Sequence, residues 1–464
     1  MSDRRLFVGA LAALSTLSLT FFLCGLQRAN WTTLRGDEIL TLTRFERGQT
    51  LGSLLAKGAF GQVSPAPLLY VVDMALDASR TKLNYLGLHP QGYYRLPSLL
   101  LTAVLGLMAA MAVAFKIRTQ EGGGSPLQYF LVFCGLAVLY FHPKVFALAC
   151  TERPYGLWIG LWLFSMAWLL GRPPAPKVPL VALSLLAATA TAACFQILAI
   201  GIALVIVRRI DGRPAKEILK EGALLLSLPA LIGAYYALRS MDAGAEDREA
   251  VEKAPLFLRF WLLSNLHVWI AGGAMTWFAL KRPALRELAL PSVALTTMIL
   301  LMPIIVLLSH LKGYTMPSRQ YIWTSTAVPL AFFFAAIAWP ELKPSRYLRA
   351  VAVVASLAIV AGNVYATSKR ELRNDSRELA MLRSDSALMV MLQKERPRSI
   401  TTKLEDIERK NLFLIMDWIT QGYRHLPKVD RDVFIVDRNG RLEASVGARP
   451  KELEKELHIH TLED

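Results

Sequence analysis

The sequence predicts a polytopic α-helical membrane protein of about 11 transmembrane helices with a small polar C-terminal domain. Hydrophobic residues make up 54% of the 464-residue chain, which is too apolar for a soluble enzyme. Apolar runs of about 20 residues, the length that crosses a bilayer core of roughly 30 Å, recur until about Thr367. Basic residues occupy alternate loops, so these loops can all lie on the cytoplasmic side of one membrane.

The first helix is expected over residues 6–26. Arg4 and Arg5 precede it and place the N-terminus in the cytoplasm. No small-residue cleavage site follows, so we interpret this helix as an uncleaved signal anchor. Residues 27–92 then form a long extracytoplasmic loop with short interfacial helices over residues 51–57 and 68–76.

The apolar run over residues 180–207, with Gln196 near its middle, is too long for one upright helix. Arg208 and Arg209 follow it and mark the cytoplasm, which favours two short helices broken near residues 193–196. A single span reverses the later topology. The other spans are expected over residues 94–115, 127–141, 155–170, 218–238, 256–280, 290–308, 322–339 and 349–366, with the C-terminus outside.

The chain divides into a transmembrane domain over residues 1–367 and an extracytoplasmic α/β domain over residues 368–464. The second domain is predicted to contain a helix over residues 368–395 and a short helix over residues 449–457. Residues 432–446 read as a hairpin around Asn439 and Gly440. This second domain carries no nucleotide-binding loop or catalytic triad motif, and the chain shows no internal repeat.

The net charge of +16 lies almost entirely before residue 368, because 19 Lys and Arg are balanced by 18 Asp and Glu after it. This excess of positive charge indicates that basic loops are retained on the cytoplasmic side, or that the protein contacts anionic lipid or phosphate. Nucleic acid is not expected as a partner, because no compact basic domain exists. The four cysteines lie in or beside apolar spans and predict no disulfide framework, and neither Cys nor His residues have metal-site spacing.

Ionisable residues are expected to gather on the extracytoplasmic side. A carboxylate there can take a proton from an attacking hydroxyl, and cations can hold a leaving phosphate. Each position also has a structural alternative, such as the start of a solvated loop helix, an ion pair at a helix start or a snorkelling arginine. The residues are Asp37, Glu38, Lys82, Arg95, Glu152, Arg153 and Arg319.

Five motifs occur in a characteristic order before residue 367. An acidic pair lies in the first outer loop (RGDEILTLTRFERG), and SPAPLLY and YYRLPSLL follow it. TERPYGLWIGL comes after the third helix, and SRQYIWTSTAVPLAFFFA opens a late helix. This order resembles the GT-C superfamily of membrane glycosyltransferases. It is most similar to the bacterial, family 39-like branch that includes protein O-mannosyltransferases and the aminoarabinose transferase of lipid A.

The resemblance implies an inverting transfer of a sugar from a polyprenyl-phosphate carrier to an acceptor hydroxyl on the extracytoplasmic face. Asp37 matches the catalytic base, Glu38 belongs to the same motif, and Glu152 would assist at the acceptor or donor. One departure is SPAP at residues 64–67, where family members often have His-Pro-Pro. The residues expected to bind substrate or phosphate are Lys82, Arg95, Arg153, Tyr155, Arg319 and Tyr321.

The sequence leaves several features of the function open. The acceptor is a lipid, a glycan or a protein, and a divalent cation could bind the acidic pair through oxygen ligands. A transporter of polyprenyl-linked glycolipid or a non-catalytic scaffold of a glycan assembly complex is the alternative to an enzyme. A transporter is expected to carry mid-membrane charges and a repeated half, which this sequence lacks. The expected location is the bacterial inner membrane, with the site facing the periplasm.

Overall fold

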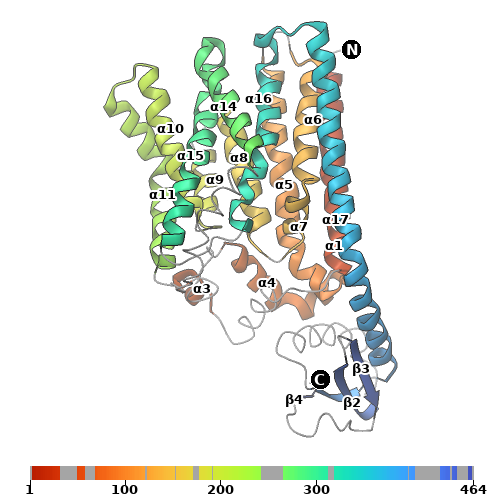
Figure 1. Ribbon diagram of the computed structural model, residues 1–464. Coiled ribbons are helices and arrows are strands. Elements are labelled where there is room, and N and C mark those ends of the chain that lie inside the picture. The colour runs from red at the N-terminus through yellow and green to blue at the C-terminus, as the bar shows by residue number, and fades with distance from the viewer. Residues whose placement is uncertain are drawn as a thin grey trace.

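The computed structural model is a helix bundle from which one long helix leads to a small β-sheet (Figure 1). This architecture confirms the predicted polytopic α-helical fold class. The structure describes residues 3–31, 50–57, 68–120, 123–151, 153–170, 177–190, 192–241, 265–311, 318–395, 397–402, 429–438, 441–446 and 458–461.

Within these described residues, seven helices are long and apolar enough to cross a membrane. An eighth span arises if α6 (Pro126–Tyr140) and α7 (Pro143–Ala149), which are bent by 63° relative to each other, count as one. The seven are α1 (Asp3–Trp31), α5 (Pro90–Arg118), α10 (Ala193–Ile210), α11 (Ala215–Met241), α15 (Ala289–Leu311), α16 (Ala327–Leu342) and α17 (Arg346–Glu395).

Every span expected from the sequence has a helix at its place. Five of these helices have 16 residues or fewer, which is too short to cross a bilayer when upright, so the number of complete crossings stays a prediction. Besides α6 and α16 they are α8 (Tyr155–Leu169), α9 (Lys177–Ala187) and α14 (Leu266–Lys281). A break in the 180–207 run is confirmed, because one helix ends at Ala187 and the next begins at Ala193, but it precedes the expected position at residues 193–196, which are helical.

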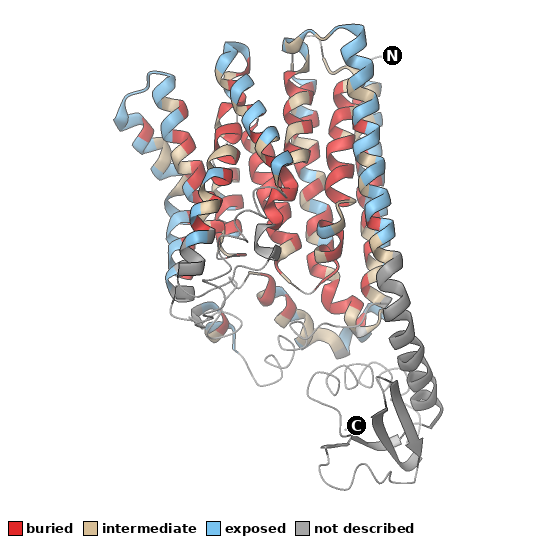
Figure 2. Ribbon diagram, in the orientation of Figure 1, coloured by how far each residue is buried: buried red, intermediate tan, exposed pale blue. Residues whose placement is uncertain are grey.

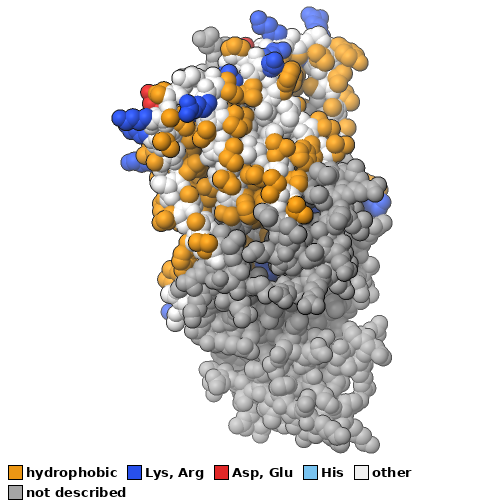
Figure 3. All heavy atoms as spheres, turned by 60° about the vertical axis from the view of Figure 1, so that its left-hand side comes forward, with side chains coloured by type: hydrophobic (Ala, Val, Ile, Leu, Met, Phe, Trp, Pro, Cys, Tyr) orange, Lys and Arg blue, Asp and Glu red, His pale blue; other side chains and the backbone are white. Residues whose placement is uncertain are grey.

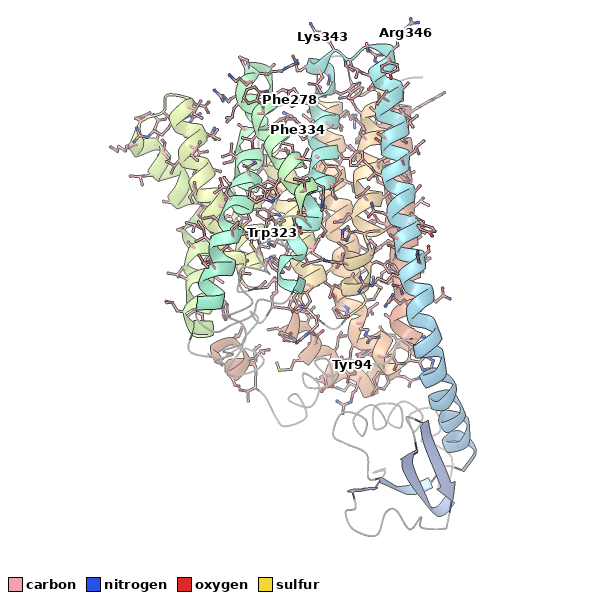
Figure 4. All side chains as sticks on the ribbon, in the orientation of Figure 1. Tyr94, Phe278, Trp323, Phe334, Lys343 and Arg346 are labelled. Carbon is pink, nitrogen blue, oxygen red and sulfur yellow. The ribbon has the colours of Figure 1, made fainter. Side chains whose placement is uncertain are left out.

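The two ends of the bundle differ in their side chains. At the basic end, defined by the Lys and Arg residues that close α5, α10 and α14 and open α17, cations project beyond an apolar belt (Figure 3). Figure 4 labels Lys343 and Arg346 there and Tyr94 near the opposite end. Arg118 of α5 lies over the Phe7 ring of α1, 4.6 Å from its centroid, so both helices meet at the basic end.

The opposite end, the α4 end, carries four short elements. Both interfacial helices expected in the first loop are confirmed as α3 (Leu51–Lys57) and α4 (Leu68–Leu83). A 3₁₀ turn, η1 (Asn84–Gly87), joins α4 to α5. A second 3₁₀ segment, η3 (Ser318–Thr326), precedes α16 and packs against α7 and α8.

One helix, α17, crosses the predicted domain boundary at residue 367 without interruption. At 1.5 Å per residue its 50 residues span about 75 Å, more than twice a bilayer core. Thr367 donates a 2.6 Å hydrogen bond to the Phe141 carbonyl between α6 and α7, and Glu371 forms an ion pair with Arg28 of α1. These contacts fix the middle of α17 to the bundle.

The C-terminal sheet has the strand order β3-β2-β1-β4 (β3 Arg441–Val446, β2 Val429–Arg438, β1 Pro397–Thr402, β4 His458–Thr461). The predicted hairpin is confirmed, because β2 pairs antiparallel with β3 and Arg438 lies opposite Arg441. β1 is parallel to β2 and antiparallel to β4. The short helix expected over residues 449–457 lies outside the described residues.

The hydrophobic core surrounds α8, which is buried on almost every face, including Trp158 and Trp162 (Figure 2). α11 and the first part of α17 expose large apolar side chains, as expected for surfaces that face lipid. All four cysteines are free thiols.

Candidate functional site

α4 is fixed to three different parts of the bundle at the α4 end. Its first amide, of Leu68, donates a 3.0 Å hydrogen bond to the Ala188 carbonyl in the α9–α10 break. The Arg153 guanidinium, in the turn before α8, donates a 3.1 Å bond to the Tyr70 hydroxyl. The Tyr94 hydroxyl of α5 donates to the Asp77 carboxylate at 2.6 Å. These contacts fix α4 to the α9–α10 break, α5 and the turn before α8.

A small aromatic core, separate from the main hydrophobic core, packs against α4 and includes Tyr70 of that helix. Tyr85 enters it because three consecutive non-glycine residues, Asn84 to Leu86, have positive φ of 45°, 49° and 56°. A left-handed conformation costs roughly 1–2 kcal/mol per residue, so burial must offset it. Tyr85 is completely buried and packs edge-to-face on Tyr93, with ring centroids 5.2 Å apart.

Arg95 is buried in the first turns of α5, with only 1% of its surface exposed. Its guanidinium donates a 3.1 Å hydrogen bond to the Ala29 carbonyl at the end of α1. Asn30 completes this junction, because its side-chain oxygen accepts the His89 amide at 2.7 Å. Burial lowers the pKa of His89. A buried cation is costly unless it is hydrogen-bonded, so its retention here indicates a requirement for charge.

The Arg95 and Arg153 positions belong to one neighbourhood. Ser98, one helical turn after Arg95, donates a 3.1 Å hydrogen bond to the Arg153 carbonyl. Tyr155 begins α8 immediately after this turn and is partly buried. The Arg153 guanidinium beside the Tyr70 hydroxyl can bind the oxygens of an anionic group such as a phosphate, and Arg95 lies one turn before Ser98 in the same neighbourhood.

The other predicted site residues differ in how far the structure describes them. Lys82 is exposed on the last turn of α4. Arg319 and Tyr321 belong to η3, whose contact with α8 places this segment beside the turn that carries Arg153, although their side chains are not described. The three carboxylates predicted to be catalytic, Asp37, Glu38 and Glu152, lie outside the described residues. Among the described residues, no three or more His, Cys, Asp or Glu side chains form a group that could hold a metal ion.

No role was predicted from the sequence for the polar residues of α4. Asp73 is completely buried, and Asp77 accepts the Tyr94 hydrogen bond one turn later. Tyr70 belongs to the SPAPLLY motif but was given no role of its own. The signal was the spacing of two aspartates four residues apart in an apolar helix, which puts both on one face.

No protein-family model matches the sequence, and neither does any curated protein sequence. The fold matches a solved structure, described as the crystal structure of ArnT from Cupriavidus metallidurans bound to undecaprenyl phosphate. The TM-score is 0.50 at 12% sequence identity, and the match covers 95% of this chain and 98% of that one. The likeness confirms, at the level of the fold, the predicted resemblance to membrane glycosyltransferases of the GT-C class.

Proposed function

We propose that this chain is an inverting membrane glycosyltransferase. It moves a sugar from a polyprenyl-phosphate-linked donor to the hydroxyl of a lipid, glycan or protein acceptor. The observation that carries the proposal is the match in fold, over nearly the whole of both chains, to a protein solved with undecaprenyl phosphate bound. The buried cations at the α4 end support it independently, because a lipid phosphate needs such partners at a membrane surface.

In the proposed reaction, the Asp37 carboxylate removes the proton from the acceptor hydroxyl as its oxygen attacks the anomeric carbon. The bond between that carbon and the phosphate oxygen breaks, and polyprenyl phosphate leaves with the electron pair. Attack opposite the leaving group inverts the anomeric centre. Glu38 and Glu152 are proposed to orient the acceptor or donor beside Asp37.

Cations stabilise the negative charge that develops on the leaving phosphate. Arg95 and Arg153 are proposed for this role because the α1–α5 junction and the Tyr70 contact hold them in position before substrate binds. Preorganised donors avoid the cost of reorientation during the reaction. Lys82, Tyr155, Arg319 and Tyr321 are proposed to make further contacts with the donor head group.

The lipid chain of the carrier needs an apolar path from the bilayer. An open groove of about 550 Å³ between α10 and α11 offers one, since its lining is almost entirely apolar from Cys194 along to Ile206. The site is proposed to face the periplasm from a bacterial inner membrane. The basic end, where positive residues concentrate, then faces the cytoplasm.

A transfer assay in proteoliposomes tests the proposal. The purified chain receives radiolabelled polyprenyl-phosphate sugars together with a lipid extract of its own host. Wild-type protein should release polyprenyl phosphate and label an acceptor, whereas Asp37→Asn should fold and insert but lose at least about 100-fold in rate, the usual contribution of a general base. Asp211→Asn, a matched change at the basic end, should retain transfer.

The product identifies the acceptor as lipid, polysaccharide or protein. Retained turnover in Asp37→Asn removes that residue as the base. If wild-type protein binds the carrier, or moves it across the bilayer, without ever cleaving it, the enzyme proposal fails in favour of a transporter or scaffold.

A further inference from the structure

Two buried glutamines of the bundle have contrasting surroundings. Gln128 of α6, near the basic end, has both ends of its amide satisfied. Its nitrogen donates to the Gln120 side chain and the Ala336 carbonyl, both at 2.9 Å, and its oxygen accepts the Ser125 amide. Gln196 of α10 is completely buried. Its oxygen accepts a 2.7 Å hydrogen bond from the Trp158 indole of α8, whereas its nitrogen has no hydrogen-bond partner in the described part of the chain.

The orientation of the Gln196 amide follows from chemistry. An indole N–H is a donor only, so the carbonyl oxygen of the amide must face Trp158. The NH₂ group therefore points away from Trp158 with two protons to donate. A buried donor without an acceptor is costly, and inside a membrane protein the penalty is largest. A donor in this state requires an acceptor that the described part of the chain does not supply.

Gln196 belongs to the same ring of contacts that fixes α4. Leu68 of α4 bonds to Ala188 in the break just before α10, and Tyr70 bonds to Arg153, five residues before Trp158 on the α8 segment. The Trp158–Gln196 bond closes this ring between α8 and α10. Trp158 lies three residues after Tyr155, the first residue of α8, a rise of about 4.5 Å. Its bond to Gln196 is therefore within about one helical turn of the start of α8, which follows the turn that carries Arg153.

The apolar groove begins at the same level of α10 but on its other face. Cys194 and Ile197 line the end of the groove nearest the α9–α10 break, whereas Gln196 faces Trp158 of α8. A lipid chain in the groove would therefore bring its polar head to the start of α10. The ligand that fits such a position joins a long apolar chain to a head group with acceptor oxygens.

We infer that the Gln196 amide, held by Trp158, is a positioning donor for a head-group oxygen of the lipid-linked sugar. This inference rests on the proposed function and deepens it, because it assigns a neutral hydrogen-bond donor beside the cations. The accepting oxygen belongs to the phosphate or to a sugar hydroxyl. Either oxygen can accept a hydrogen bond from the amide N–H. The phosphate oxygen is present in the free and the sugar-charged carrier, whereas the sugar hydroxyl is present only in the charged carrier.

The test compares two variants, each of which removes one of the two buried glutamine amides. Trp158→Phe/Gln196→Met removes both partners of the α8–α10 bond together, so no new unsatisfied group remains. Its thermal unfolding temperature in detergent should stay close to wild type. Gln128→Leu removes a fully satisfied amide and strands its partners, so its unfolding temperature should fall, while its ligand affinity per folded molecule stays unchanged.

Measurements with two ligands distinguish whether the accepting oxygen belongs to the phosphate or to the sugar. Binding of undecaprenyl phosphate, measured as a ligand-induced rise in unfolding temperature over a concentration series, reports on the phosphate. The KM for the sugar-charged carrier in the transfer assay reports on the sugar as well. The double variant should weaken one or both about three- to tenfold, the effect of one hydrogen bond. Loss on both assigns the phosphate, and loss confined to the charged carrier assigns the sugar.

The inference is overturned if wild type binds or turns over the carrier and the double variant does so equally well. The Gln196 donor then serves an internal water. Carrier binding without turnover in wild type defeats the proposed enzyme while the binding arm still decides the role of Gln196. A wild-type chain that neither binds nor turns over the carrier overturns both.

Discussion

The two ends of the helix bundle handle charge in opposite ways. At the basic end, charged pairs stay in contact with the surroundings, as in Lys116–Glu287, whose side chains are 22% and 30% exposed. At the α4 end, Arg95 and Asp73 are buried almost completely. Exposed pairs contribute little to stability, whereas burial of charge is expensive. The two ends therefore differ in the burial of charge, which the basic end avoids and the α4 end contains.

Backbone geometry differs in degree between the ends, because among the described residues the basic end has a single left-handed non-glycine residue, Lys343 after α16, and the α4 end has three in succession. The left-handed turn at Asn84–Leu86, which carries a conformational cost, lies at the α4 end and brings Tyr85 under α4. Such strain persists only where surrounding contacts determine it, and it concentrates at functional sites. The comparison between the ends can therefore be tested by equal changes at each.

Among the comparisons between the two ends, the largest effect is expected from Arg95→Met. It removes the buried guanidinium and its bond to Ala29 while keeping the apolar stem, so transfer should fall roughly 10- to 100-fold, the range for a hydrogen bond to a charged group. Lys116→Met at the basic end should cost less than about 1 kcal/mol and leave transfer unchanged. Initial rates in proteoliposomes measure both. Equal rates for the two variants would remove the distinction between the ends.

A smaller effect is expected when a methyl group is added to a glycine near either end of α1. A Cβ on Gly92 would lie 2.6 Å from the Asn30 side-chain oxygen and 3.0 Å from its Cα, which would force α5 away from α1. Gly92→Ala should destabilise by about 1–3 kcal/mol, the usual cost of overpacking. Gly9→Ala, near the start of α1 with nothing within 4 Å, should be neutral or stabilising by up to about 1 kcal/mol. Thermal unfolding in one detergent decides between these signs.

A third comparison concerns ion pairs. The Arg28–Glu371 pair joins α1 to α17, with side chains only 9% and 21% exposed. Glu371→Gln should cost about 1–3 kcal/mol, because a partly buried cation loses its charged acceptor. Glu217→Gln breaks an exposed pair with Arg213 at the basic end and should cost about 0.3–0.5 kcal/mol. Equal losses, measured by unfolding in denaturant, would mean that α17 is not fixed through this pair.

The sequence predicted the elements of the fold because hydrophobic length and basic loops are local signals. The break between α9 and α10 followed from the length of residues 180–207 and the arginines after them. The continuity of α17 was not predicted, since apolar residues give way to polar ones at Thr367. A helix needs no change of backbone conformation to leave a membrane, so composition marks the membrane surface and not the end of the helix.

The site was less predictable, because its contacts join residues distant in sequence. Arg95 and Arg153 could be proposed as cations from their positions, but their bonds to Ala29 and Tyr70 depend on packing between helices. The orientation of Gln196 depends in the same way on Trp158, 38 residues earlier. The roles of Asp37, Glu38 and Glu152 stay predictions from the sequence.

The smallest effect concerns pH and the His89 side chain at the α1–α5 junction. Burial lowers the pKa of His89 below its usual value near 6.5, so the unfolded chain binds a proton more readily than the folded one. Stability at the α4 end should therefore decrease as the pH falls below about 6.5, while the arginines of the basic end stay charged throughout. His89→Gln keeps the backbone bond to Asn30 and should match wild type at pH 7.5 but unfold at a higher temperature than wild type at pH 5. Parallel unfolding curves across this range would show that His89 titrates alike in both states.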